Sequence, residues 1–128
     1  MSIDLKLLAW SAALTFVQML FAVLGTMLQV GLPTLAGNRD KFPMIEDWAG
    51  RAQRAHDNML ESLVLFAVLV LVAHVSGRAN AMTALGAQLF FWARVAYGLV
   101  YLIGIPWLRT GVWTVSIVGL VLIFLQLL

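Results

Sequence analysis

The stretch RAQRAHDNMLESLVLFAVLVLVAHV, residues 51–75, joins a strongly polar segment directly to a long apolar one. From Met59 to Val75, only Glu61 and His74 interrupt the apolar run. A helix needs about 20 mostly apolar residues to cross the roughly 30 Å hydrocarbon layer of a bilayer. This stretch therefore predicts a membrane-spanning helix that begins in a polar segment and carries an acidic residue into the lipid.

The composition of the whole chain is that of a membrane protein. Of its 128 residues, 62% are hydrophobic and 11% are charged, and the mean hydropathy is +0.96. Soluble domains average about 45–50% apolar and about 25% charged residues. A chain this short cannot bury so much apolar surface in water, which excludes a disordered chain, a nucleic-acid-binding tail and an ordinary cytosolic enzyme. The absence of cysteine excludes disulfides and thiolate metal sites.

Three further apolar segments predict an all-α, four-helix membrane bundle that forms a single domain, residues 1–128. We expect spans at about residues 7–32, 59–75, 81–105 and 111–128, with a long charged loop at about residues 33–57. Helices suit this role because lipid cannot satisfy unpaired backbone groups. The first span is too long for the apolar part of a signal peptide, so we expect it to be retained.

The distribution of Lys and Arg predicts the orientation, because cytoplasmic loops carry an excess of both. Five such residues flank the side of the first and third loops, and two flank the other side. We therefore expect the long loop in the cytoplasm and both termini on the non-cytoplasmic side. The five are Arg39, Lys41, Arg51, Arg54 and Arg109, and the two are Lys6 and Arg78.

One face of the second helix carries a polar stripe. At 100° per residue, its four members fall within about 80° of one another, and Asp57 lies at the edge. Because the stripe descends into an apolar helix, it is a candidate site, although its two arginines are also typical of headgroup anchors. The members are Arg51, Arg54, Asn58 and Glu61.

A second stripe lies on the third span, where Arg94, Tyr97 and Tyr101 follow at helical spacing. Arg94 is expected roughly 15 Å deep. A charge near the bilayer centre costs at least ~2.5–3.5 kcal/mol and usually faces the bundle interior with a partner. We expect Glu61 as that partner and Asp57 as the next candidate. A purely structural ion pair, with the tyrosines as interfacial aromatics, remains the alternative interpretation.

Arg109 and Thr110 extend this set just beyond the third span. Four arginines against one or two carboxylates predict a cationic pocket that opens to the cytoplasm. It suits a small molecule with more than one carboxylate and an ammonium group. The histidines predict neither a haem nor a metal site, because His56 and His74 lie 18 residues apart on one helix and cannot ligate one haem.

Two motifs resemble those of the MAPEG family, the membrane-associated proteins of eicosanoid and glutathione metabolism. They are RAQRAHDNMLE at residues 51–61 and RVAYGLVY at residues 94–101, and LAGNRD at residues 35–40 looks like bacterial members. The family includes microsomal glutathione transferases and prostaglandin E synthase. The resemblance implies a homotrimer of four-helix subunits, with glutathione bound between neighbouring subunits. For a bacterial-type member, the expected location is the inner membrane.

The resemblance also implies roles for individual residues. Arg109 and Thr110 match an Arg-Ser pair that stabilises the glutathione thiolate, and Tyr101 is an alternative hydrogen-bond donor. The chain departs from the prostaglandin synthase at Asp57, a position where that enzyme has an Arg. It also lacks an embedded Arg in the first span, where Gln29 is the polar candidate. The implied glutathione-binding residues are Arg51, Arg54, Asn58, Glu61, Arg94 and Tyr97.

Three functions follow as hypotheses. The first is a glutathione transferase or peroxidase acting on small lipophilic electrophiles, because a nearby Arg favours the nucleophilic thiolate over the thiol. The second is a MAPEG-fold protein without glutathione chemistry that binds a lipid or a small anion. The third, an exporter of cationic drugs, is disfavoured because four arginines repel such cargo. The expected co-substrate is glutathione, with no metal, and the expected partners are other copies, membrane lipid and a lipophilic substrate, not nucleic acid.

Overall fold

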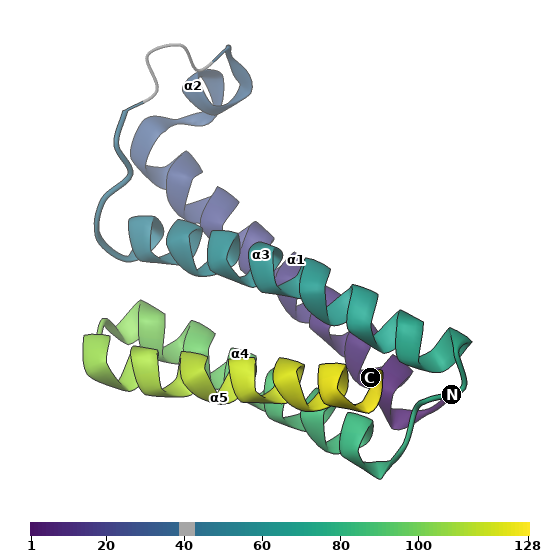
Figure 1. Ribbon diagram of the computed structural model, residues 1–128. Coiled ribbons are helices and arrows are strands. Elements are labelled where there is room, and N and C mark those ends of the chain that lie inside the picture. Colours follow the sequence, from purple (N-terminus) through teal and green to yellow (C-terminus); the bar gives the residue numbers. More distant parts are fainter. Residues whose placement is uncertain (39–42) are drawn as a thin grey trace.

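The computed structural model describes residues 1–38 and 43–128, which form five helices and no strand. The four long ones are α1 (Ile3–Val30), α3 (Asp47–Val75), α4 (Ala81–Ile103) and α5 (Pro106–Gln126), and each is long and apolar enough to cross a membrane. The short α2 (Leu32–Ala36) follows α1 directly. The predicted all-α bundle is confirmed (Figure 1). Arg39, Lys41 and Asp40, which entered the topology and motif arguments, lie outside the described residues.

Local signals set both ends of α4. The Asn80 Oδ1 accepts hydrogen bonds from the backbone N–H groups of Met82 and Thr83, both at 2.9 Å, and Thr83 Oγ1 accepts one from the Asn80 N–H at 2.8 Å. This reciprocal capping satisfies amides that a helix start would leave unpaired. At the other end, Gly104 has a φ of +89°, and Pro106 begins α5. The tight turn makes α4 and α5 antiparallel neighbours.

Helix α3 begins at Asp47, well before the apolar run at Met59, so the whole polar stripe is helical. The connection from α1 is therefore shorter than the loop expected at about residues 33–57. Gln29, near the end of α1, holds the end of this connection just before α3. The Gln29 Nε2 donates to the Glu46 carbonyl at 2.6 Å, and its Oε1 accepts from the Glu46 N–H at 3.0 Å. The polar residue noted in the first span thus fixes where α3 begins.

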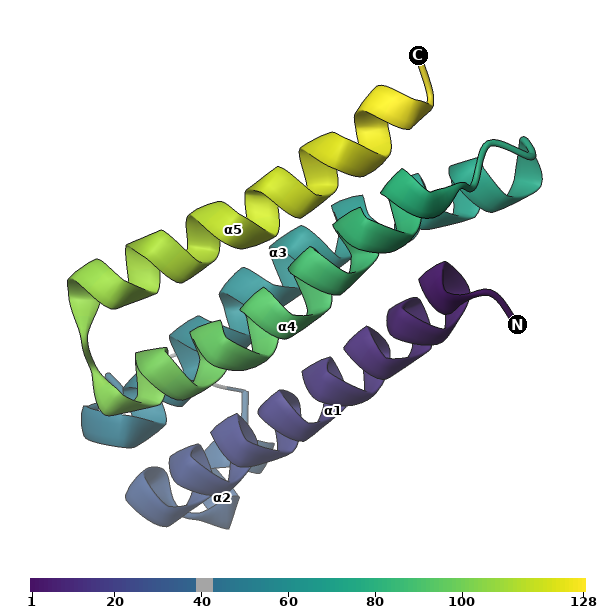
Figure 2. The same ribbon diagram turned by 90° about the horizontal axis from the view of Figure 1, so that it is seen from below.

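The long helices pack as two pairs, α1 with α3 and α4 with α5 (Figure 1), and α4 lies between α1 and α5 (Figure 2). Within the second pair, a Cβ on Gly86 would lie 2.6 Å from the Gly119 carbonyl oxygen, so the two backbones touch. Small residues allow membrane helices to approach this closely. The rings of Phe66 and Phe90 stack with centroids 4.1 Å apart and join α3 to α4 in the apolar core.

The two chain ends and the α3–α4 turn lie at one end of the bundle, and α2 and the α4–α5 turn lie at the other (Figure 1). The polar start of α3, the last turns of α4 and the start of α5 therefore share the same end. This arrangement brings both predicted polar stripes and Arg109 into one region of the molecule.

Candidate functional site

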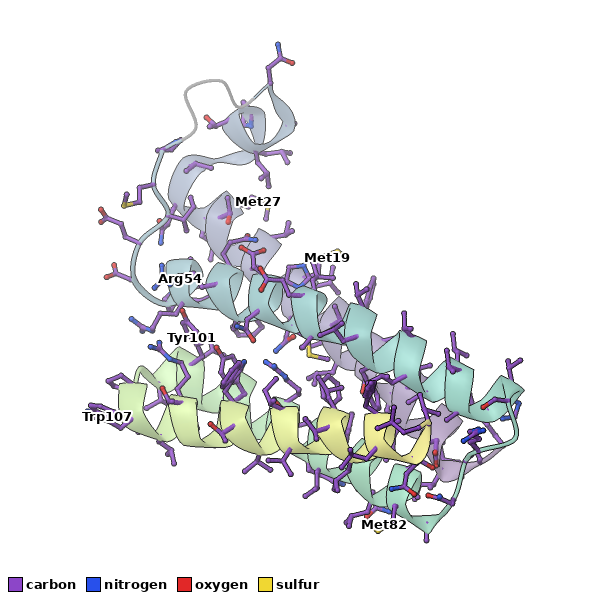
Figure 3. The ribbon with its side chains drawn as sticks, viewed as in Figure 1. Met19, Met27, Arg54, Met82, Tyr101 and Trp107 are labelled. Atoms are coloured by element: carbon purple, nitrogen blue, oxygen red, sulfur yellow. The ribbon has the colours of Figure 1, made fainter. Side chains whose placement is uncertain are left out.

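Two arginines of α3 reach across to the last turns of α4. The Arg54 Nε donates a hydrogen bond to Tyr101 Oη at 3.1 Å, and the two side chains approach each other from separate helices in Figure 3. The Arg51 Nε donates to the Leu102 carbonyl oxygen at 3.0 Å. This part of the predicted stripe therefore faces α4, where Arg51 binds the backbone and Arg54 binds a side chain.

Arg94 is fully buried, with 1% of its surface exposed. Its Nη1 donates to Asn58 Oδ1 at 2.5 Å, and its guanidinium lies 4.9 Å from the centroid of the Tyr97 ring. Its Nε and Nη2 are buried with no hydrogen-bond partner in the described part of the chain. A buried charge is costly unless it is paired and hydrogen-bonded. The surroundings of Arg94 are therefore electrostatically incomplete in the single chain.

The expected pair between Glu61 and Arg94 is wrong for the single chain. Glu61 is exposed, and Asn58, one helical turn earlier, binds Arg94 instead. Asp57, the next candidate, is also exposed, and its Oδ1 accepts from Gln53 Nε2 on the same helix at 3.0 Å. Asn58 and Glu61 are about 60° apart on one stripe, and the packing of α3 against α4 selects which of them faces Arg94.

Tyr101 lies between two cations. The Arg109 guanidinium lies 4.5 Å from the centroid of its ring, and the Arg54 guanidinium lies 5.9 Å from it. The Tyr97 and Tyr101 rings meet edge to face at 5.6 Å. A guanidinium over an aromatic face is attracted by the ring quadrupole. The tyrosines therefore hold several positive charges close together without neutralising them.

A cavity of about 180 Å³ opens beside these groups. Three helices line it: Asn58 comes from α3, Tyr97 from α4, and Arg109, Thr110 and Trp113 from α5. The Thr110 Oγ1 donates to the Pro106 carbonyl at 3.2 Å, so its hydroxyl proton is used within α5. To act as the expected donor to a ligand, this hydroxyl has to rotate.

Trp113 lines the cavity but is not among the residues predicted from the sequence, because neither polar stripe includes it. The sequence offered a signal for it: Trp113 follows Arg109 by four residues, so the two share a helix face.

Glu61 and Asp57 are not part of the cavity lining, and Arg51 contributes through its contact with α4. Within residues 1–38 and 43–128, no three His, Asp or Glu side chains are grouped to hold a metal ion. The predicted residues that do gather are Arg54, Asn58, Arg94, Tyr97, Tyr101, Arg109 and Thr110.

The fold and this cationic, aromatic cavity define an integral membrane protein built as a four-helix bundle. The chain belongs to the MAPEG family, whose family model matches residues 7–128. The match confirms the family indicated by the motifs at residues 51–61 and 94–101, and it fits a membrane protein with a glutathione-related function. Comparisons with curated proteins and with solved structures found no match.

Proposed function

We propose that the protein is a membrane-bound, glutathione-dependent transferase or peroxidase acting on small lipophilic electrophiles. The observation that carries this proposal is the buried Arg94, two of whose nitrogens lack partners among the described residues. Arg54 and Arg109 lie near the same tyrosines. Guanidinium groups bind carboxylates strongly, and glutathione offers two. It also brings the thiol that this cysteine-free chain cannot supply.

Each residue then has a role in binding the tripeptide. Asn58 and Tyr97 line the cavity, and the buried Arg94, hydrogen-bonded to Asn58, attracts a bound carboxylate through its charge. Arg51 and Arg54 lie at the last turns of α4, where we place a second contact with the tripeptide. The exposed Glu61 is not paired with Arg94, which leaves its carboxylate available to accept the ligand ammonium group.

The chemistry depends on the thiolate, because the thiol itself is a poor nucleophile. Arg109 favours the charged sulfur and lowers the pKa of the bound thiol, with Thr110 or Tyr101 as hydrogen-bond donor. In the transferase reaction, the sulfur forms a bond to the electrophilic carbon. The electron pair of the breaking bond departs with the leaving group, or remains on an epoxide oxygen that then takes a proton. The lipophilic electrophile reaches the sulfur through the bilayer.

The proposed assembly is a homotrimer in a bacterial inner membrane, with the site opening to the cytoplasm. Two observations support an assembly of several copies. The guanidinium of Arg94 lacks a complete set of hydrogen-bond partners within the described part of one chain. The Glu61 carboxylate is exposed on the surface of α3, within the apolar part of that helix. A helix from a neighbouring copy would cover both groups, and the family resemblance favours three copies.

Thermal unfolding in mild detergent, with and without glutathione, tests the proposed function. A ligand at 100 times its Kd adds about 2.7 kcal/mol of apparent stability, so we expect a clear rise in Tm. The variant Arg94→Met removes the buried charge while keeping an apolar side chain of similar length. It should unfold near the wild-type temperature without ligand and lose the glutathione-dependent rise.

The control ligands separate the two remaining functions. S-methylglutathione should stabilise the wild type, because it keeps both carboxylates, but it cannot react. If glutathione and S-methylglutathione have no effect while inorganic phosphate or an anionic lipid raises the Tm, the protein binds a lipid or small anion and has no glutathione chemistry. That result would overturn the proposal.

A further inference from the structure

Tyr97 places a free hydroxyl in the candidate cavity. Its side chain is 5% exposed and lines the cavity between α3, α4 and α5. The hydroxyl makes no hydrogen bond in the described part of the chain. Unlike Arg94 Nε, however, it is not among the polar atoms that the protein encloses completely. Because the rest of the side chain is buried, the open side of this hydroxyl faces the cavity.

The two other hydroxyls near the site are already used. The Thr110 Oγ1 donates its proton to the Pro106 carbonyl oxygen at 3.2 Å. The Tyr101 Oη accepts a hydrogen bond from Arg54 at 3.1 Å, and Tyr101 does not line the cavity. Among the described residues, the Tyr97 hydroxyl therefore combines access to the cavity with a proton that no protein group accepts.

The ring of Tyr97 is held in place by contacts that leave its hydroxyl free. The Arg94 guanidinium lies 4.9 Å from the ring centroid, and the Tyr101 ring meets the Tyr97 ring edge to face at 5.6 Å. From the α5 side, Arg109 lines the same cavity of about 180 Å³. Ligand pockets usually measure roughly 300–1,000 Å³, so this one has room only for reacting ends. A group that lines it lies close to the reacting atoms.

We propose that Tyr97 is a catalytic residue that gives its proton to the oxygen atom released from the electrophile. The site then acts on electrophiles whose leaving atom is oxygen, namely alkyl hydroperoxides and epoxides. This inference rests on the proposed function, because it needs the glutathione thiolate near Arg109. It adds the acid that such reactions require, since an alkoxide is a poor leaving group until it is protonated.

The proposed step balances for both kinds of electrophile. With a hydroperoxide, the sulfur bonds to the terminal oxygen, the O–O bond breaks, and the released alkoxide takes the Tyr97 proton. The products are an alcohol and glutathione sulfenic acid, which a second glutathione converts to the disulfide and water. With an epoxide, the sulfur bonds to carbon, the C–O bond breaks, and the alkoxide takes the same proton. The thiol of the next bound glutathione returns a proton to the tyrosinate as it ionises.

The ratio of two rates tests the role of Tyr97. One substrate is cumene hydroperoxide, and the other is chlorodinitrobenzene, whose chloride leaves without a proton. Both reactions start from the same bound thiolate, so changes in glutathione binding or in the thiol pKa cancel in the ratio. Tyr97→Phe removes the hydroxyl and keeps the ring beside Arg94. The ratio of the hydroperoxide rate to the chlorodinitrobenzene rate should fall about 10²-fold, within the usual contribution of a positioned acid.

Two further variants make the test specific. Tyr101→Phe changes the other tyrosine of α4, whose effect on the sulfur acts on both rates alike, so the ratio should stay near that of the wild type. Tyr97→His supplies a different proton donor and should restore part of the ratio below about pH 6.5, where His is protonated. It carries the test if Tyr97→Phe does not fold.

Three results would overturn the inference. An unchanged ratio in Tyr97→Phe would mean that Tyr97 only lines the cavity, and a ratio that falls in Tyr101→Phe instead would make Tyr101 the donor. A wild type that conjugates chlorodinitrobenzene but consumes neither hydroperoxide nor epoxide would leave the proposed function standing and remove this step. By contrast, no reaction with any of these electrophiles and no rise of Tm with glutathione would overturn the proposed function itself.

Discussion

Asn58 contacts Arg94 through an amide oxygen, which accepts a hydrogen bond but carries no charge. A carboxylate at this position would form a closed ion pair and would leave little attraction for an anionic ligand. The neutral partner instead orients the guanidinium while preserving its charge. Glu61, exposed one turn further along α3, keeps its own carboxylate unpaired with Arg94. In the proposed function, Asn58 orients Arg94 and Glu61 accepts the ammonium group of the ligand.

Replacing Asn58 with Ala should destabilise the ligand-free protein more than replacing Glu61 with Ala. The first change removes the hydrogen bond to Arg94, and hydrogen bonds to charged groups contribute about 1.5–3 kcal/mol. The second removes a side chain that makes no contact with Arg94 in the single chain, so the free energy of unfolding should fall less. Unfolding of both variants in the same detergent measures the difference. A larger loss for Glu61→Ala would show that Glu61 contacts Arg94 in the assembled protein.

Replacing Arg109 with Ala should raise the pKa of the bound glutathione thiol, because the nearby positive charge is lost. A rise of one or two units lowers the thiolate fraction at neutral pH about ten- to a hundredfold, at about 1.36 kcal/mol per unit. The rate should fall less, since a more basic thiolate is more reactive. The ultraviolet absorbance of the thiolate, titrated against pH, reads the pKa directly.

The control for this titration is Arg109→Lys, which keeps the charge but not the planar group over the Tyr101 ring. It should recover most of the wild-type thiolate. An unchanged titration in Arg109→Ala would remove Arg109 from the mechanism.

At the scale of the helices, the sequence predicted the features that depend on residues close together in the chain. The apolar runs located the four spans, and their spacing placed Arg94, Tyr97 and Tyr101 on one face of α4. The start of α3 was not predictable in this way, because Gln29 and Glu46 meet only when α1 and α3 pack together. Which stripe residue faces Arg94 also depends on packing. Periodicity fixes angles within one helix, not the rotation of one helix against another.

Replacing Gly86 with Ala should weaken the contact between α4 and α5. The added Cβ would lie 2.6 Å from the Gly119 carbonyl oxygen, so the backbones must separate. Overpacking of this kind costs about 1–3 kcal/mol. Gly111→Ala is the matched control, because nothing lies within 4 Å of its Cβ, and Ala favours a helix by roughly 0.8–1 kcal/mol over Gly. We expect Tm to be lowest for Gly86→Ala, intermediate for the wild type and highest for Gly111→Ala. A Gly86→Ala variant with the Tm of the wild type would contradict the close approach of the two helices.

The molecule gathers most of its arginines toward one end and leaves them incompletely covered. The cavity between α3, α4 and α5 opens there, and Arg94 behind it lacks hydrogen-bond partners for two nitrogens within the described residues. A second cavity, of about 260 Å³, lies between α1, α3 and α4 and shares no lining residue with this one.

We expect the protein to assemble as a homotrimer that covers Glu61. This residue lies two residues inside the apolar run of α3 that begins at Met59, and it is exposed in the single chain. A carboxylate that faced lipid at this depth would cost at least ~2.5 kcal/mol, and a neighbouring copy removes that exposure. The mass in mild detergent should correspond to three chains, and a photo-reactive residue at position 61 should link two copies. A monomeric mass, with adducts at position 61 only to lipid or detergent, would contradict the trimer and leave Glu61 facing the bilayer.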